Sequence, residues 1–133
     1  MTVEKQDIRS DFYAGNTKDI QITIVDDTSA PFNLSGCEIA WCLFTDDWEP
    51  LVRKSSANGS AEIEVTDEAG GIVEIHLIPT DTATLQGTYR HQCNVIDSYG
   101  YVETVTTGTI SIFPAMAKRN RKARVKAFLQ GSL

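Results

Sequence analysis

Apolar and polar residues alternate along most of the first 113 residues, and helical periodicity is nearly absent there. In residues 18–25, Ile20, Ile22 and Ile24 share one face while Gln21 and Thr23 share the other. This period of two residues predicts a half-buried β-strand. The same alternation recurs in four further segments, residues 37–44, 61–65, 72–78 and 87–97.

Clusters of Gly, Pro, Asn, Asp and Ser separate these segments and predict turns. A short charged segment, residues 51–55, is typical of an edge strand. Seven or eight strands with turns every 8 to 12 residues or so are expected for a sandwich or barrel. The pattern therefore predicts an all-β fold, an antiparallel immunoglobulin-like β-sandwich, rather than an α/β enzyme fold.

The segment 101–113 is rich in Thr, Val and Ile, but its apolar positions change parity. Val105 is odd-numbered whereas Ile110 and Ile112 are even-numbered, and Gly108 lies between them. A β-bulge or kink places one extra residue in a strand and shifts the faces of all that follow. We therefore expect an irregularity at Gly108.

The connection "PTDTATLQGTY" (79–89) predicts a corner between two strands. Thr80 or Asp81 can cap a single helical turn that runs through Ala83. Tyr89 then enters the next strand and is expected to tie its hydroxyl back to the backbone, as tyrosine corners do. We expect the structural core to include five residues of this corner and of segment 37–44: Ile39, Trp41, Leu85, Gly87 and Tyr89.

Two histidines and three cysteines are the main candidates for chemistry. His91 shares a predicted face with Cys93, and a Cys–His pair can act as nucleophile and base. Both residues lie on one strand facing a packed core, without a third orienting group, so a structural histidine is favoured. His76 is predicted to be solvated on the polar face of its strand. The sequence predicts no catalytic residue, no metal site and no cofactor, and hence no enzyme.

The cysteines Cys37, Cys42 and Cys93 are odd in number and form no CxxC pair, so reduced, packed thiols are predicted. The acidic pairs Asp26–Asp27 and Asp46–Asp47 lie in turns. They can hold calcium, but turn hydrogen bonding is favoured because no EF-hand spacing is present.

Length and composition agree with one globular domain: 133 residues, 41% hydrophobic and 23% charged. No apolar run is long enough to cross a membrane, and the N-terminus has no secretory h-region. We therefore expect the chain to be made in a cytoplasm, with no membrane partner.

The charge is unevenly distributed. All 18 acidic residues and six of the 12 basic ones lie before residue 104, which gives that part a formal charge of −12. The tail carries the remaining six basic residues and no acid, so its charge is +6: Lys118, Arg119, Arg121, Lys122, Arg124 and Lys126. Such asymmetry is typical of an interaction arm.

The tail also contains Val125, Phe128 and Leu129, which meet on one side of a helical wheel if Pro114 starts a helix. Three roles fit this composition: a docking arm for a neighbouring protein, a phosphate-binding segment, and a solvated tail. Docking is favoured. Nucleic acid is disfavoured because the body is acidic. A basic tail and an acidic body also suit head-to-tail association of copies.

Several motifs together resemble a known family. They are "GNTKDI" (15–20), "NLSGCEIAW" (33–41), "IPTDTATLQGTY" (78–89) and "VTTGTISI" (105–112). The set is similar to the Ig-like β-sandwich virion proteins of bacteriophages and prophages, akin to the N-terminal domain of phage baseplate upper protein. The resemblance covers about residues 12–113.

The resemblance implies a structural protein of a tailed-phage virion, made in the bacterial host cytoplasm and then located in the virion. Its organisation would be an N-terminal segment (1–11), a sandwich (12–113) and a basic arm (114–133). The arm would dock onto the tail, baseplate or fibre-attachment apparatus. The alternative is a capsid decoration protein or a head–tail junction component. Expected partners are other virion proteins (tail, portal, neck or capsid) and further copies of the chain.

A carbohydrate-binding module is a less favoured alternative. It depends on Trp48, Tyr99 and Tyr101, loop aromatics that could stack on a sugar.

Overall fold

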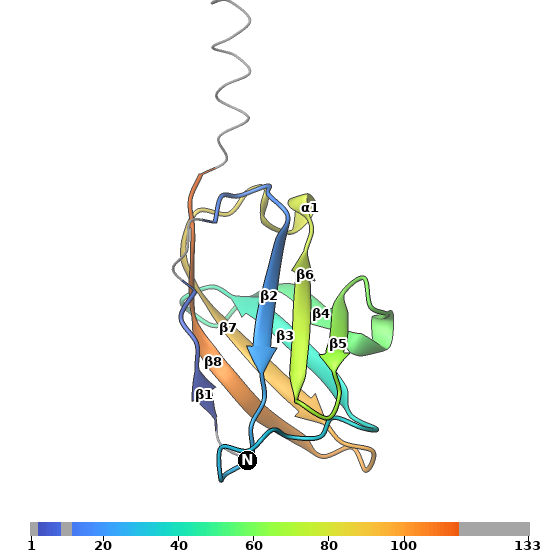
Figure 1. Ribbon diagram of the computed structural model, residues 1–133. Coiled ribbons are helices and arrows are strands. Elements are labelled where there is room, and N and C mark those ends of the chain that lie inside the picture. The colour runs from blue at the N-terminus through green and yellow to red at the C-terminus, as the bar shows by residue number, and fades with distance from the viewer. Residues whose placement is uncertain (1–2, 9–11, 115–133) are drawn as a thin grey trace, which may run out of the picture.

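The computed structural model describes residues 3–8 and 12–114 of the chain, which form two packed β-sheets (Figure 1). The five-stranded sheet has the order β1-β8-β7-β3-β4, and the three-stranded sheet has the order β2-β6-β5. The strands are β1 (Glu4–Lys5), β2 (Lys18–Thr23), β3 (Glu38–Phe44), β4 (Pro50–Ser55), β5 (Ile63–Asp67), β6 (Ile72–Leu77), β7 (Gly87–Ile96) and β8 (Val102–Ile112).

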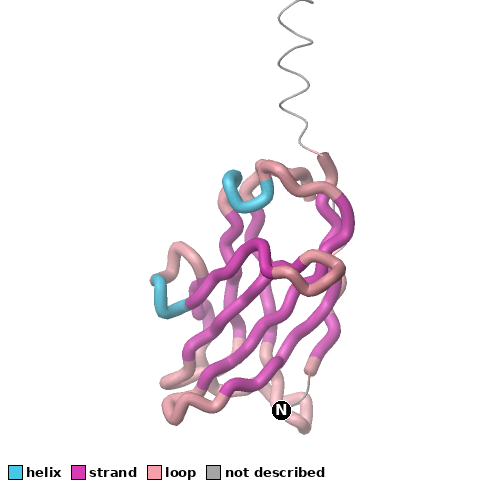
Figure 2. The backbone as a smooth tube through the Cα atoms, turned by 180° about the vertical axis from the view of Figure 1, so that it is seen from behind, coloured by secondary structure: helices cyan, strands magenta, loops and turns pink. Residues whose placement is uncertain are grey.

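Two short helical turns complete the described structure, η1 (Ser56–Asn58) and α1 (Pro79–Thr82). Figure 2 shows them from the opposite side, one beside the sheets and one at an end of the sandwich. Apart from the parallel pair β1 and β8, the named strands pair antiparallel.

This strand order is that of an immunoglobulin-like sandwich. Strands β2, β6 and β5 take the places of B, E and D, while β3, β7 and β8 take those of C, F and G. Strand β4 extends the second sheet as a C′ strand. The predicted all-β, Ig-like sandwich is therefore confirmed.

The core lies where the predicted parity placed it. Ile20, Ile22 and Ile24 are buried on the three-stranded side, and Trp41 on β3 is almost fully buried on the other side. Trp41 pairs directly with Cys93 of β7. Trp41 thus occupies the central position that an Ig-like sandwich gives to its strand-C tryptophan.

Strand β8 contains the predicted irregularity, but at a different place. The register with β7 shifts between Cys93 and Asn94, which pair with Thr106 and Thr104 respectively. The extra residue is therefore Val105, and the expectation of a bulge at Gly108 is wrong.

Gly108 is needed for close approach instead. A Cβ at this position would overlap the carbonyl of Gln6, and it would crowd Nε2 of His91. Only a glycine lets the N-terminal segment lie directly against β8 here.

The alternation of residues does not predict β1, because two residues are too short to show a period. The segment pairs with β8 through Glu4 and Lys5, and the N–H of Gln6 donates to the carbonyl of Thr107 at 2.7 Å. Ile8 forms a further bridge to Ile110 and is buried. Residues 3–8 thus line the outer edge of β8.

Candidate functional site

The corner that follows β6 joins distant parts of the sandwich through side chains. The carboxylate of Asp81 accepts a hydrogen bond from the Ile78 N–H at 2.8 Å and lies 2.8 Å from Nζ of Lys54. Lys54 belongs to edge strand β4, and its side chain is 7% exposed. Buried charges of this kind require a partner, which Asp81 supplies.

The predicted cap of the helical turn is wrong in position. Helix α1 begins at Pro79 with Ile78 as its N-cap, two or three residues earlier than a cap at Thr80 or Asp81 would place it. Proline suits the first helical position because its φ is already fixed there. Asp81 lies within the first turn of the helix, where its carboxylate accepts the hydrogen bond of the Ile78 N–H.

Thr82 and Tyr89 complete the corner. The hydroxyl of Thr82 is fully buried and accepts a hydrogen bond from the N–H of Gly15 at 3.1 Å. The Tyr89 hydroxyl donates to the Gln86 carbonyl and accepts from the Gln86 N–H, both at 2.9 Å. The predicted tyrosine corner is therefore present, and residues 78–89 connect separate parts of the sandwich.

The remaining predicted core residues take different positions. Ile39 is fully buried, whereas Leu85 and Tyr89 are half-buried and pack against the core. Gly87 is exposed, and its φ of +117° is one that an L side chain rarely adopts. Gly87 thus serves the chain reversal before β7.

His91 is completely buried on the inner face of β7, and both of its ring nitrogens are in use. The indole N–H of Trp41 donates to Nδ1 at 3.2 Å, and Nε2 donates to the Gln6 carbonyl at 2.7 Å. Burial lowers the pKa of His91. The ring is therefore a neutral tautomer that joins β3, β7 and the N-terminal segment.

Cys93 does not form a catalytic pair with His91. Burial raises the pKa of its thiol to about 12, so the nucleophilic thiolate is strongly disfavoured. His91 also has no free nitrogen with which to act as a base. The geometry thus supports a structural role for both residues.

A hollow of about 330 Å³ lies on the outer face of the five-stranded sheet. Cys42 and Phe44 line it together with charged residues, among them Glu38 and Arg53. Burial raises the pKa of the Cys42 thiol, which donates weakly to the Leu43 carbonyl. No histidine lines this hollow.

The loop aromatics have different surroundings. The guanidinium of Arg90 lies 4.8 Å from the ring centroid of Trp48, and the Phe44 ring packs against Trp48 at 5.3 Å. Tyr99 and Tyr101, in contrast, are 85% and 73% exposed. Trp48 is therefore already engaged by its own chain.

The acidic turn residues also serve the chain itself. Asp26 accepts hydrogen bonds from the hydroxyl and the N–H of Thr28 and from the N–H of Ala30, and the hydroxyl bond is the main cause of its lowered pKa. Asp46 lies 3.3 Å from Nε of Arg90. These contacts are the turn hydrogen bonding and ion pairing that such residues commonly provide.

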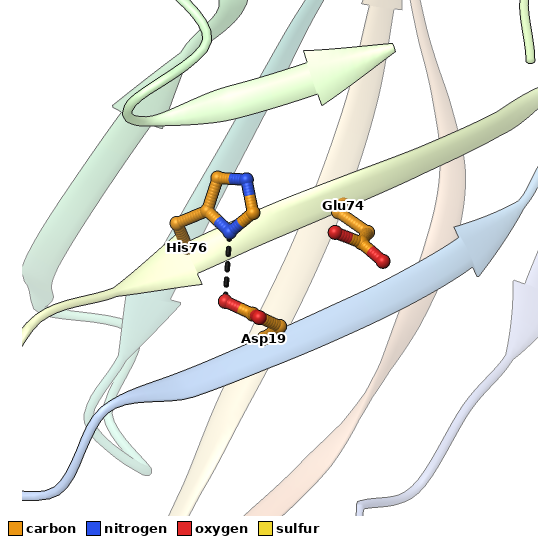
Figure 3. Close-up of side chains that lie close together, drawn as sticks. All are labelled: Asp19, Glu74 and His76. Atoms are coloured by element: carbon orange, nitrogen blue, oxygen red, sulfur yellow. Dashed lines mark hydrogen bonds and ion pairs between the residues drawn. The ribbon is translucent and has the colours of Figure 1, made fainter. Parts of the chain in front are cut away.

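One cluster on the outer face of the three-stranded sheet was missed by sequence reasoning. Asp19 of β2 and Glu74 and His76 of β6 bring three donor atoms within 4.8 Å of one another (Figure 3). Nδ1 of His76 lies 2.7 Å from Oδ1 of Asp19, and Nε2 lies 3.5 Å from Oε1 of Glu64 on β5. The hydrogen bond to Asp19 is the main cause of a raised His76 pKa.

Part of this cluster could have been predicted from the alternation of residues along β6. Glu74 and His76 are two residues apart on one strand, so they share its outer face. Asp19 joins them only because the register pairs it with His76 across the sheet. That register follows from the pairing of strands more than 50 residues apart.

The predicted docking residues of the arm lie outside the described residues. They are Lys118, Arg119, Arg121, Lys122, Arg124, Val125, Lys126, Phe128 and Leu129. Among the described residues, no helix is long and apolar enough to span a membrane.

The chain has similar solved structures but matches no known protein family. No protein-family model and no curated protein sequence matches the chain. Among solved structures, CopC from Methylosinus trichosporium OB3b is similar over 87% of this chain and 88% of its own, with TM-score 0.40 and 10% identity. The fibronectin(III)-like modules of Clostridium thermocellum CbhA are similar over 87% of this chain and 94% of theirs, with TM-score 0.41 and 11% identity.

Proposed function

We propose that the protein is a non-enzymatic structural component of a tailed-bacteriophage virion. Its sandwich attaches to the tail, baseplate or fibre-attachment apparatus through the basic arm, residues 114–133. The observation that carries this proposal is the contact between two motifs of the resemblance, which lie 67 residues apart. Gly15 of "GNTKDI" donates to Thr82 of "IPTDTATLQGTY".

A structural role also suits the chemistry of the described residues. Within the 78–89 corner, the side chains of Asp81, Thr82 and Tyr89 bond to the chain itself, and so does His91. The buried thiol of Cys93 has a pKa of about 12. The motif residues described here therefore hold strands together and do not form a reactive site.

The arm starts from a firmly held position. Phe113 exchanges backbone hydrogen bonds with Phe12 and Ala14 at 2.8 Å, and its ring packs against Tyr13 at 5.4 Å. This end of β8 lies at the same end of the sandwich as α1 (Figure 1). The chain therefore leaves the sandwich at this end, where the arm begins.

Deletion of residues 115–133 tests the proposal. The truncated protein should keep its β-sheet circular dichroism and cooperative unfolding but fail to enter phage particles. Normal incorporation of the folded truncated protein would contradict a docking arm.

Two further variants separate charge from apolar contact. One replaces the six basic residues of the arm with Gln, and the other replaces Val125, Phe128 and Leu129 with Ser. If the arm enters an apolar groove, the Ser variant should lose incorporation at every salt concentration. The Gln variant should lose most at low salt, because salt screens charge attraction.

Cryo-electron microscopy of intact particles tests the location. Density at the tail, baseplate or fibre attachment is the expected result. Density on the capsid lattice would instead indicate a decoration protein, and absence from particles would contradict a virion role altogether.

A further inference from the structure

We propose that Asp19, Glu74 and His76 form a binding site for a divalent transition-metal ion of the zinc class on the outer face of the three-stranded sheet. The site goes beyond the proposed virion role and does not depend on it. Strand β6 supplies two of the donors and the adjacent strand β2 supplies the third (Figure 3).

The donor set determines the class of ion. One imidazole nitrogen and two carboxylates suit zinc and related first-row metals. Calcium prefers six to eight oxygen ligands, which this open face does not offer. Three protein ligands leave further coordination positions to water.

The geometry needs only a small adjustment. The donor atoms lie within 4.8 Å of one another, whereas bonds of about 2.0–2.2 Å to zinc bring its ligands somewhat closer together. The Asp19 side chain is 56% exposed and Glu74 is half-buried, so both side chains have room to rotate inward. The His76 ring, 22% exposed, is the better-fixed ligand.

An independent feature of the sheet also favours a cation. Glu64 on β5 and Glu74 on β6 are paired directly across the strands. Like charges directly opposite each other are destabilising in an antiparallel pair. A bound cation would relieve this repulsion, and Glu64, 3.5 Å from Nε2 of His76, supports the imidazole ring from the third strand.

The chain makes the test unusually clean. It has two histidines, and the other one, His91, has both nitrogens engaged in the core. The competing soft ligands are the partly exposed thiols of Cys37 and Cys42. Zinc binding should therefore be measured on the full-length Cys37→Ser/Cys42→Ser variant, with ZnCl₂ as the probe.

Isothermal titration calorimetry should show saturable binding of one zinc ion per chain. His76→Gln should weaken the affinity at least about tenfold, because loss of even a supporting residue of a metal site commonly costs that much. Asp19→Asn and Glu74→Gln should each weaken it as well. Glu49→Gln removes the same charge from an exposed turn outside the cluster and should leave the affinity unchanged.

Proton NMR gives a second readout. Zinc should shift or broaden the imidazole signals of His76 and leave those of His91 unchanged, whereas calcium should affect neither. The proposal is overturned if zinc does not bind, if His76→Gln binds as tightly as its parent, or if Glu49→Gln weakens binding as much as the cluster variants do.

Discussion

The two histidines of the chain lie on strands of facing sheets and have opposite surroundings. His91 on β7 points inward, is fully buried, and bonds to an indole and a backbone carbonyl. His76 on β6 points outward between the carboxylates of Asp19 and Glu64. Residue type alone therefore does not determine the surroundings of a histidine in this molecule; the face of the strand does.

The surroundings also move the two pKa values in opposite directions. Burial is the main cause for His91 and lowers its pKa, because the charged ring would lose its hydration. The hydrogen bond to Asp19 is the main cause for His76 and raises its pKa. One ring is thus kept neutral as a part of the core, and the other takes up a proton more readily than an ordinary histidine does.

The largest effect is expected from the tryptophan that holds His91. Trp41→Ala should lower the free energy of unfolding by about 3–5 kcal/mol, because it empties a large core volume. It also removes the indole donor of His91. Chemical denaturation measures the change. Trp48→Ala, at a 48% exposed position, is the matched control and should cost much less; equal losses would contradict the assigned core.

A second comparison replaces each histidine with leucine. His91→Leu should cost about 1–3 kcal/mol, because the Trp41 N–H and the Gln6 carbonyl lose their buried partner. His76→Leu should change stability by no more than about 0.5 kcal/mol, as is usual for surface positions. Urea denaturation in metal-free buffer at pH 7.5 measures both. A larger loss for His76→Leu would reverse the roles assigned here.

Much of this contrast could be predicted from the sequence. Alternation placed Trp41, His91 and Cys93 on the inner faces and His76 on an outer face, since parity is a local property of a strand. The tyrosine corner at Tyr89 was predictable for the same reason, because its bond partner, Gln86, is three residues away.

Other features depend on strand pairing and were not predictable from local pattern. The Lys54–Asp81 ion pair joins edge strand β4 to α1, and the charged pattern of residues 51–55 did not indicate that Lys54 is buried. The Asp19–Glu74–His76 cluster needs the register between β2 and β6. The bulge lies at Val105, whereas the sequence analysis placed it at Gly108. A change in the parity of apolar positions shows that a strand contains a bulge, but it does not show which residue is the extra one.

The smallest expected effect is the pH response of the two rings. In metal-free buffer, the NMR signals of His76 should titrate above 6.5, the usual pKa, and those of His91 below it or not at all. His91 faces Gln6, Asp7 and Trp41, and its lowered pKa should leave it less protonated than an ordinary histidine at pH 6.5.

The signs of the stability changes follow from linkage. The contribution of His91 is complete above pH 6.5 and is lost as the pH falls toward its lowered pKa, because the unfolded chain then binds more protons. The contribution of His76 is complete below pH 6.5 and is lost as the pH rises through its raised pKa. The two effects oppose each other, so His91→Leu and His76→Leu should alter the pH profile in opposite directions. If both variants changed the pH dependence of stability in the same direction, the opposite pKa shifts assigned to the two rings would be wrong.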